Sequence, residues 1–265
     1  MSVVAAENVY GDIAAQIGGA HVHVTSILTD PNADPHLFEP GTNNGLAVAT
    51  ARVVIQNGAG YDAFMTKLER AAPSSSRIVV TIADVLGVHG RDANPHLWYD
   101  VPRIGQIAVA IASALRRADP AHARAYHHGL VRFTASLAPL RRELSRIRRS
   151  FSGRPVAYTE PVAGYLLAAA GLRNLAPSGF TRAIENGTEP TPQAVSAMDA
   201  LVTERRIDAL LYNRQAVSPI TARVRREAEH VGIPVLGVTE TLPPHLTFQQ
   251  WQLRQARALY LALGR

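Results

Sequence analysis

The sequence predicts an α/β protein with two lobes of βα repeats and mostly parallel sheets, joined by one long rigid helix. Short β-rich runs alternate with amphipathic helical stretches in both halves, the pattern of βα units. A segment without strands separates the halves. The 265 residues, 47% of them apolar, are enough for two cores. We expect an N-terminal lobe at 1–119, a linking helix at 120–150 and a C-terminal lobe at 151–265.

The N-terminal lobe is predicted from β-rich runs and the amphipathic segments between them. Val3-Val4 predicts a first strand, and a helix follows from about Glu7. Asp62 to Ala71 is amphipathic and has the length of a crossover helix. The further strands are predicted at His21 to Ser26, Val53 to Gln56 and Arg77 to Thr81.

The linking helix is predicted from a single apolar stripe. Its members recur at alternating steps of four and three, which places them on one helix face. Pro139 lies inside the stripe and should kink the helix, because proline removes one backbone hydrogen bond. Gly153-Arg154-Pro155 ends it. The stripe consists of Tyr126, Leu130, Phe133, Leu137, Leu140, Leu144 and Ile147.

The C-terminal lobe repeats the alternation of the first. Strands are predicted at Pro155 to Tyr158, Ile207 to Tyr212 and Pro234 to Val238. Helices of crossover length are predicted at Pro192 to Glu204 and Ile220 to His230.

Composition excludes several classes of function. The net charge is +6, and almost all of the basic residues are arginines. The basic segments lack the interleaved aromatic residues and the glycine-rich signature of a nucleic-acid module, so we expect no nucleic-acid partner. Cysteine is absent, which excludes disulfides and thiolate metal sites. No apolar run approaches the roughly 18 residues of a membrane span. The HExxH, GxSxG, P-loop and GxGxxG motifs of common hydrolases and nucleotide-binding proteins are also absent.

The tripeptide Pro-His-Leu occurs twice in the first hundred residues and places two histidines on stiff loops. His36 stands in Asp34–Pro40 and His96 in Asn94–Asp100. Proline fixes its own φ and restricts the residue before it, so each imidazole has little freedom to lose on binding a metal. Two unrelated surface histidines beside turn prolines are the alternative interpretation.

Two glutamates follow predicted strands of the second half, where ligands of open α/β sheets bind. Glu160 follows the strand that ends at Tyr158, and Glu240 follows the strand that ends at Val238. With the imidazoles of His36 and His96 they make a mixed nitrogen and oxygen set that suits Mn²⁺, Fe²⁺ or Zn²⁺ in the cleft between the lobes. Helix capping is the alternative role of both carboxylates.

A few further residues are candidates for supporting roles. Glu39 and Asp100 flank the two histidines and are either outer partners of a metal site or turn residues. His245 and His89 are reserve ligands.

Six motifs stand in order over nearly the whole chain: Gln16–Gly19, Asp34–Pro40, Asn57–Gly60, Asn94–Trp98, Glu189–Pro192 and Val238–Leu242. With these motifs the chain resembles the metal-binding solute-binding proteins of ABC importers, the zinc and manganese group. The resemblance implies two α/β lobes bridged by a long helix, with His36, His96, Glu160 and Glu240 as ligands. Glutamate at the third position is usual in manganese-type members, and aspartate is common at the fourth.

The resemblance also implies a function. We expect a monomeric, extracytoplasmic carrier that captures one Mn²⁺ or Zn²⁺ ion, with Fe²⁺ as a further option, and delivers it to a membrane ABC permease. No enzymatic step is implied. An export leader and any lipid-attachment cysteine are expected upstream of Met1. Two rival hypotheses are a metal-dependent hydrolase that uses the same cleft and a metal-independent binding or adhesion module on this scaffold.

Overall fold

A computed structural model describes residues 1–90 and 92–264 of the chain as two compact units. Neither unit is one continuous segment. Unit 1 consists of Met1–Trp98, Pro102–Ala138 and Thr241–Gln249, and unit 2 of Tyr99–Val101, Pro139–Glu240 and Gln250–Arg265. The predicted boundaries at 119 and 150 stay a prediction.

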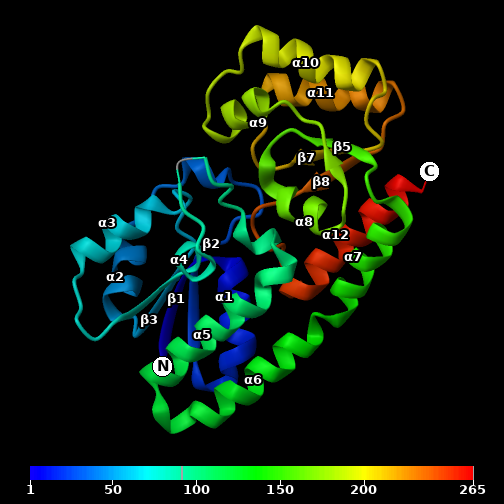
Figure 1. Cartoon of the computed structure of the whole chain (residues 1–265). Helices are drawn as coiled ribbons and strands as arrows, with labels where there is room; N and C mark the ends of the chain where they lie inside the picture. Colours follow the sequence, from blue (N-terminus) through cyan, green and yellow to red (C-terminus); the bar gives the residue numbers. More distant parts are fainter. Residues whose placement is uncertain (91, 265) are drawn as a thin grey trace. The chain divides into compact units, whose positions relative to one another are not determined.

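Unit 1 is built on a parallel sheet of order β2-β1-β3-β4 (Figure 1). Its strands are β1 (Ser2–Glu7), β2 (His23–Leu28), β3 (Val53–Gln56) and β4 (Ile78–Thr81). Its helices are α1 (Asn8–Gly18), α2 (Thr42–Thr50), α3 (Ala63–Ala71), α4 (Ile82–Leu86), α5 (Ile104–Ala118) and α6 (Ala123–Ser136).

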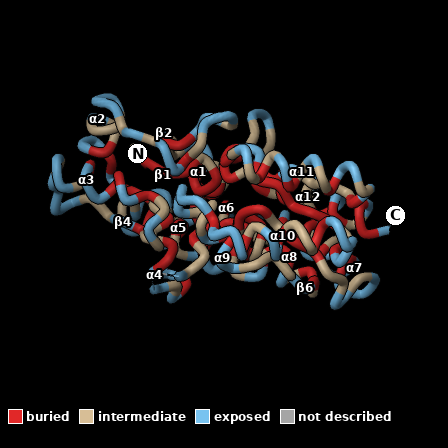
Figure 2. Tube along the Cα trace, turned by 90° about the horizontal axis from the view of Figure 1, so that it is seen from above, coloured by how far each residue is buried: buried red, intermediate tan, exposed pale blue. Residues whose placement is uncertain are grey.

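The central strand β1 is buried on both faces, which explains its nearly continuous apolar sequence (Figure 2). Alternate residues of a strand point to opposite faces. On one face, Val4 packs in a cluster with Val48 of α2 and Met65 of α3. Val3 and Ala5, on the opposite face, are also fully buried. The sheet of unit 1 is therefore covered on both faces.

Unit 2 is built on a second parallel sheet, of order β6-β5-β7-β8. One face packs against α9, α10 and α11, through a cluster that includes Phe180, Met198 and Val224. The strands are β5 (Pro155–Tyr158), β6 (Arg173–Asn174), β7 (Leu210–Asn213) and β8 (Val235–Val238). The helices are α7 (Ala138–Phe151), α8 (Gly164–Ala169), α9 (Ser178–Glu185), α10 (Pro192–Thr203), α11 (Pro219–His230) and α12 (Phe248–Leu263), whose first two residues belong to unit 1.

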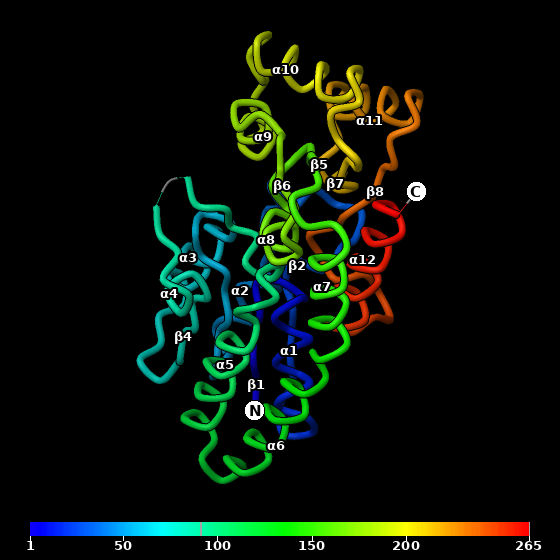
Figure 3. The backbone as a smooth tube through the Cα atoms, turned by 45° about the vertical axis from the view of Figure 1, so that its right-hand side comes forward, coloured from blue at the N-terminus to red at the C-terminus, as the bar shows by residue number. Residues whose placement is uncertain are grey.

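Two parallel-sheet α/β lobes confirm the predicted fold class. The structure corrects the prediction of one continuous linking helix, because α6 ends at Ser136 and α7 begins at Ala138 (Figure 3). Pro139 explains the break. It has no N–H to donate, and it lies in the first turn of α7, where helical N–H groups have no partner within the helix.

The late segment Thr241–Gln249 completes the hydrogen bonding of unit 1. The side chain of Asn8 donates to the Leu242 carbonyl and accepts from the Leu242 N–H, both at 2.8 Å. The Phe248 N–H donates to the Asp12 carboxylate at 2.9 Å. Residues at the start and near the end of the chain thus share one unit.

None of the helices within residues 1–90 and 92–264 combines the length and apolarity needed to cross a bilayer.

Helices α1 and α6 approach each other closely at Gly129. A Cβ added there would lie 2.0 Å from the Ile17 carbonyl oxygen. We expect Gly129→Ala to lower the free energy of unfolding by about 1–3 kcal/mol, although alanine is the better helix former. The matched variant Gly45→Ala in α2, whose Cβ would meet nothing closer than 4.0 Å, should raise it by up to about 1 kcal/mol. Urea unfolding of both variants measures this difference, and equal stability of Gly129→Ala and wild type would contradict the close approach.

Candidate functional site

The Pro-His-Leu tripeptides that contain His36 and His96 form the same local turn in unit 1. The side-chain oxygen of Asp34 accepts a hydrogen bond from the His36 N–H at 2.9 Å, and that of Asn94 accepts from the His96 N–H at 3.0 Å. In both turns the intervening proline fixes φ. The repeated sequence therefore gives two imidazoles the same rigid attachment.

The hydrogen bond from the ring of His96 selects its tautomer. Its Nδ1 lies 2.8 Å from the Asn94 Oδ1 that already accepts the backbone N–H. An amide oxygen only accepts, so Nδ1 carries the proton and Nε2 carries the lone pair. His96 is thereby prepared to bind a metal through Nε2.

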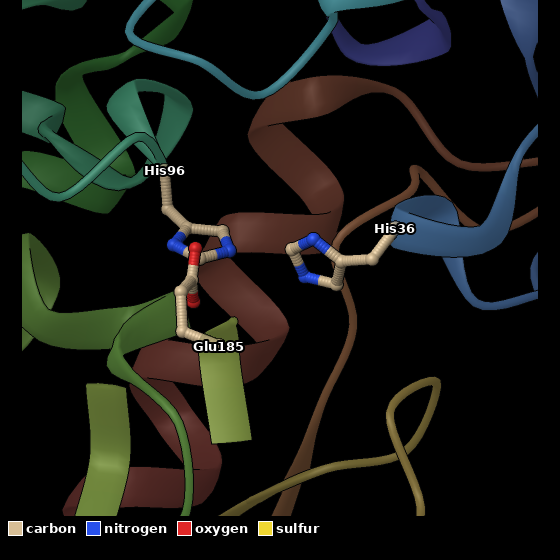
Figure 4. A group of neighbouring side chains, drawn as sticks. All are labelled: His36, His96 and Glu185. Atoms are coloured by element: carbon tan, nitrogen blue, oxygen red, sulfur yellow. The ribbon is translucent and has the colours of Figure 1, made fainter. Parts of the chain in front are cut away.

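The two imidazoles of unit 1 point toward one another (Figure 4). Each offers a ring nitrogen, and these two nitrogens lie within 4.8 Å of each other. Tyr61 contacts both rings edge-on, with centroid distances of 5.8 Å, and Trp98 contacts His96 at 5.4 Å. The aromatic contacts limit rotation of both rings, so unit 1 presents a fixed pair of nitrogen donors.

A loop after β3 fixes the backbone beside His96. The side-chain amide of Asn57 donates to the Pro95 carbonyl at 2.8 Å, and its oxygen accepts from the Tyr10 hydroxyl. Asp62 accepts the N–H groups of Asn57 and Gly58. At Gly58, φ is 76° and an added Cβ would lie 2.6 Å from Thr81, so this turn requires glycine.

A buried carboxyl pair lies at the base of the same loop. Glu7 ends β1 and is fully buried. Burial raises its pKa well above the usual value, and the neighbouring Asp62 carboxylate raises it further. Burial also raises the pKa of Asp62, while hydrogen bonds from the Gly58 and Asn57 N–H groups lower it. Glu7 is therefore held protonated well above the pH at which a glutamate usually ionises.

Unit 2 brings together its two candidate carboxylates. Glu160 follows β5, Glu240 follows β8, and each is 1% exposed. Oxygens of the two side chains lie within 4.8 Å of each other. The side-chain nitrogen of Asn213, the last residue of β7, donates to Glu160 Oε2 and, at 2.8 Å, to Glu240 Oε1. Unit 2 thus presents a pair of oxygen donors joined by one amide.

Neighbouring hydrogen bonds fix the orientation of the Asn213 amide. Its Oδ1 accepts from the Gln215 N–H at 3.0 Å, so the NH2 group must face the carboxylates. The Gln215 side chain accepts from the Glu240 N–H at 2.6 Å. Gln215 therefore holds both the backbone of Glu240 and the side-chain amide of Asn213.

The structure also bears on the other predicted roles. Glu160 is the N-cap of the short helix Pro161–Ala163, but its side chain makes no capping hydrogen bond. Glu39 and His245 are exposed. Among the described residues, neither joins the histidines of unit 1 in a group of potential ligands, and buried Asp100 does not join the carboxylates of unit 2.

The sequence reasoning missed three residues. Asn213 follows a strand just as Glu160 and Glu240 do, and the strand-end rule would have found it if amides had been considered. Tyr61 gave no signal beyond its place after Asn57–Gly60. Glu185, the last residue of α9 and labelled in Figure 4, raises the pKa of Tyr158 in addition to the larger effect of burial.

The four predicted ligands provide two imidazole nitrogens and two carboxylates. This donor set suits divalent Mn, Fe and Zn, and the two carboxylates can neutralise the charge of one such ion. That all four residues bind the same ion stays a prediction.

Known proteins resemble this chain in sequence and fold. The manganese-binding lipoprotein MntA of Bacillus subtilis is 26% identical over 157 residues, 56% of this chain and 51% of MntA. The iron-binding protein YfeA of Yersinia pestis is 29% identical over 154 residues, 55% of this chain and 49% of YfeA. The chain thus covers only about half the length of these relatives.

The fold is shared with a solved structure. The laminin-binding protein Lmb of Streptococcus agalactiae, described as having adhesin and metal-transporting activity, matches with a TM-score of 0.83 and 23% identity over 99% of both chains. The family described as "Zinc-uptake complex component A periplasmic" matches residues 3–262. That match covers nearly the whole chain, and the protein belongs to this family.

Proposed function

We propose that the protein is the extracytoplasmic metal-binding component of an ABC importer, which captures one divalent cation and delivers it to a membrane permease. The observation that carries this proposal is the pair of His36 and His96, fixed on matching turns with ring nitrogens within 4.8 Å of each other. Family membership supports the transport role. We further propose that the carrier acts as a monomer.

We propose that His36, His96, Glu160 and Glu240 bind the same ion. Two carboxylates neutralise a divalent cation, which avoids the large cost of burying an uncompensated charge. Four protein ligands complete a tetrahedral coordination sphere, whereas catalytic zinc sites have three protein ligands and one open position. This donor count favours a carrier over a metallohydrolase.

The cargo is proposed to be Zn²⁺ or Mn²⁺, with Fe²⁺ as a further option. The family name refers to zinc, whereas the names of the two relatives refer to manganese and iron. A site with nitrogen and oxygen donors generally binds Zn²⁺ more tightly than Mn²⁺, so affinity alone favours zinc.

Competitive metal loading tests the proposal. The protein is stripped with chelator, given equimolar Mn²⁺, Fe²⁺ and Zn²⁺ without oxygen, freed of excess metal and analysed by mass spectrometry. We expect about one retained ion per chain, as four ligands for one ion require. Absence of retained metal would refute the carrier function and leave only the shared fold.

A further inference from the structure

We infer that Asn213 is a positioning residue that makes Glu160 and Glu240 bind metal through one oxygen each and thereby favours Zn²⁺ over Mn²⁺. The inference rests on the proposed function. It starts from a feature that lies wholly within unit 2, the single amide that donates to both carboxylates.

The amide is committed to these two hydrogen bonds. Asn213 is 1% exposed, so water cannot readily replace either carboxylate. Its oxygen faces the Gln215 N–H, so a flip of the amide would set two acceptors against each other at the carboxylates and a donor against a donor at Gln215. Both N–H bonds of the amide therefore stay directed at Glu160 and Glu240.

The two hydrogen bonds restrict how the carboxylates can coordinate. A carboxylate can bind a cation through one oxygen or chelate it through both. Glu160 Oε2 and Glu240 Oε1 are the oxygens that face the amide. Each of these oxygens shares its electron density with a buried N–H, so it is the weaker donor to a cation, and giving up the hydrogen bond would leave that N–H unsatisfied, which is costly. The metal therefore binds through the other oxygen of each carboxylate.

Single-oxygen binding favours a particular coordination number. Two such carboxylates and two imidazoles provide four donors, the tetrahedral number that Zn²⁺ adopts in proteins. Mn²⁺ prefers octahedral surroundings rich in oxygen, which chelating carboxylates would supply better. Asn213 thus acts on metal choice without itself touching the ion.

Cobalt spectroscopy tests this inference directly, because tetrahedral Co²⁺ absorbs visible light much more strongly than six-coordinate Co²⁺. We expect wild type loaded with Co²⁺ to show the intense tetrahedral bands. Asn213→Ala should show weaker bands, and the ratio of its Zn²⁺ to Mn²⁺ affinity should fall by about 10–100-fold, the usual effect of losing an outer partner of a metal site. Competition titration measures the ratio.

Two further variants complete the design. Asn213→Leu keeps the volume of the side chain without its hydrogen bonds and should act like Asn213→Ala, which covers the case that alanine disturbs folding. Asn174→Ala removes an exposed asparagine on β6 of the same unit and should leave both readouts unchanged. Far-UV circular dichroism of the metal-free proteins checks that all are folded.

The outcomes separate this inference from the proposed function. Wild type that binds no metal would refute the carrier function itself. Wild type that binds metal but lacks the tetrahedral bands would overturn the role of Asn213. So would Asn213 variants that keep the wild-type spectrum, or that lose Zn²⁺ and Mn²⁺ affinity by the same factor.

Discussion

Replacing His96 with alanine is expected to lower affinity for the transported metal by more than about 100-fold, because even the loss of an outer partner costs about 10–100-fold. The substitution removes a nitrogen donor whose tautomer and orientation are set by Asn94 and whose ring is fully buried. The variant leaves only one imidazole, that of His36, in this pair of nitrogen donors of unit 1. The effect should therefore appear as loss of binding and not as a changed preference among metals.

Thermal unfolding gives the cleanest measurement of this loss. At a metal concentration of about 1,000 times Kd, binding stabilises the folded state by about 4 kcal/mol, which corresponds to about 8–16 °C in Tm for a chain of this size. Wild type should show this rise and His96→Ala should not. His230→Ala changes an exposed histidine at the end of α11, provides the control and should behave as wild type. A normal rise in His96→Ala would remove His96 from the set of ligands.

Replacing Glu7 with glutamine is expected to stabilise the protein at neutral and alkaline pH. Burial raises the pKa of Glu7 well above its usual 4.5, so the folded state keeps a proton that the unfolded state releases. The stability that this proton provides is complete below about pH 4.5 and is lost as the pH rises through the folded-state pKa, at about 1.4 kcal/mol per pH unit. Glutamine resembles the protonated acid at every pH and avoids the loss.

Urea unfolding of the metal-free protein at about pH 4.5, 6 and 8 measures this effect. The two proteins should be equally stable at the lowest pH, and the advantage of Glu7→Gln should grow with pH. Glu204→Gln, which changes a largely exposed glutamate, should follow wild type throughout. Parallel pH profiles for Glu7→Gln and wild type would show that Glu7 ionises as an ordinary glutamate.

The inner strands of both sheets could be predicted from the sequence because they are short apolar runs whose residues are mostly buried. The predicted bounds of β3 and β5 match the structure. The two-residue strand β6 was missed, since Arg173 and Asn174 are exposed and have no apolar pattern. The strand predicted from Ile207 begins only at Leu210 because apolar character does not show where pairing starts.

Pro139 is the sequence signal for the break between α6 and α7, but it was interpreted as a kink within one helix. The apolar stripe is buried on both sides of Leu137, as expected for one helix. Pro139 was expected to bend that helix, whereas it lies in the first turn of a new one. Burial follows the periodicity of the side chains, but continuity depends on backbone hydrogen bonds that periodicity does not report.

Local parts of the candidate site were more predictable than its support. The rigid attachment of His36 and His96 follows from the Asp-Pro-His and Asn-Pro-His sequences, because all partners lie within two residues. Asn57 and Asn213 could not be assigned in the same way. Their hydrogen-bond partners lie 38, 53 and 27 residues away, distances that only the folded chain brings together.

Because the segment Thr241–Gln249 belongs to unit 1, this unit cannot finish folding until that segment has been synthesised. During synthesis this segment emerges about 100 residues after Ala138, the end of the preceding part of the unit. At about 5–20 residues per second, the polar groups of Asn8 and Asp12 wait on the order of 10 s for Leu242 and Phe248. Unit 1 therefore stays incompletely folded until Thr241–Gln249 is made, an interval in which chaperones can still engage the nascent chain.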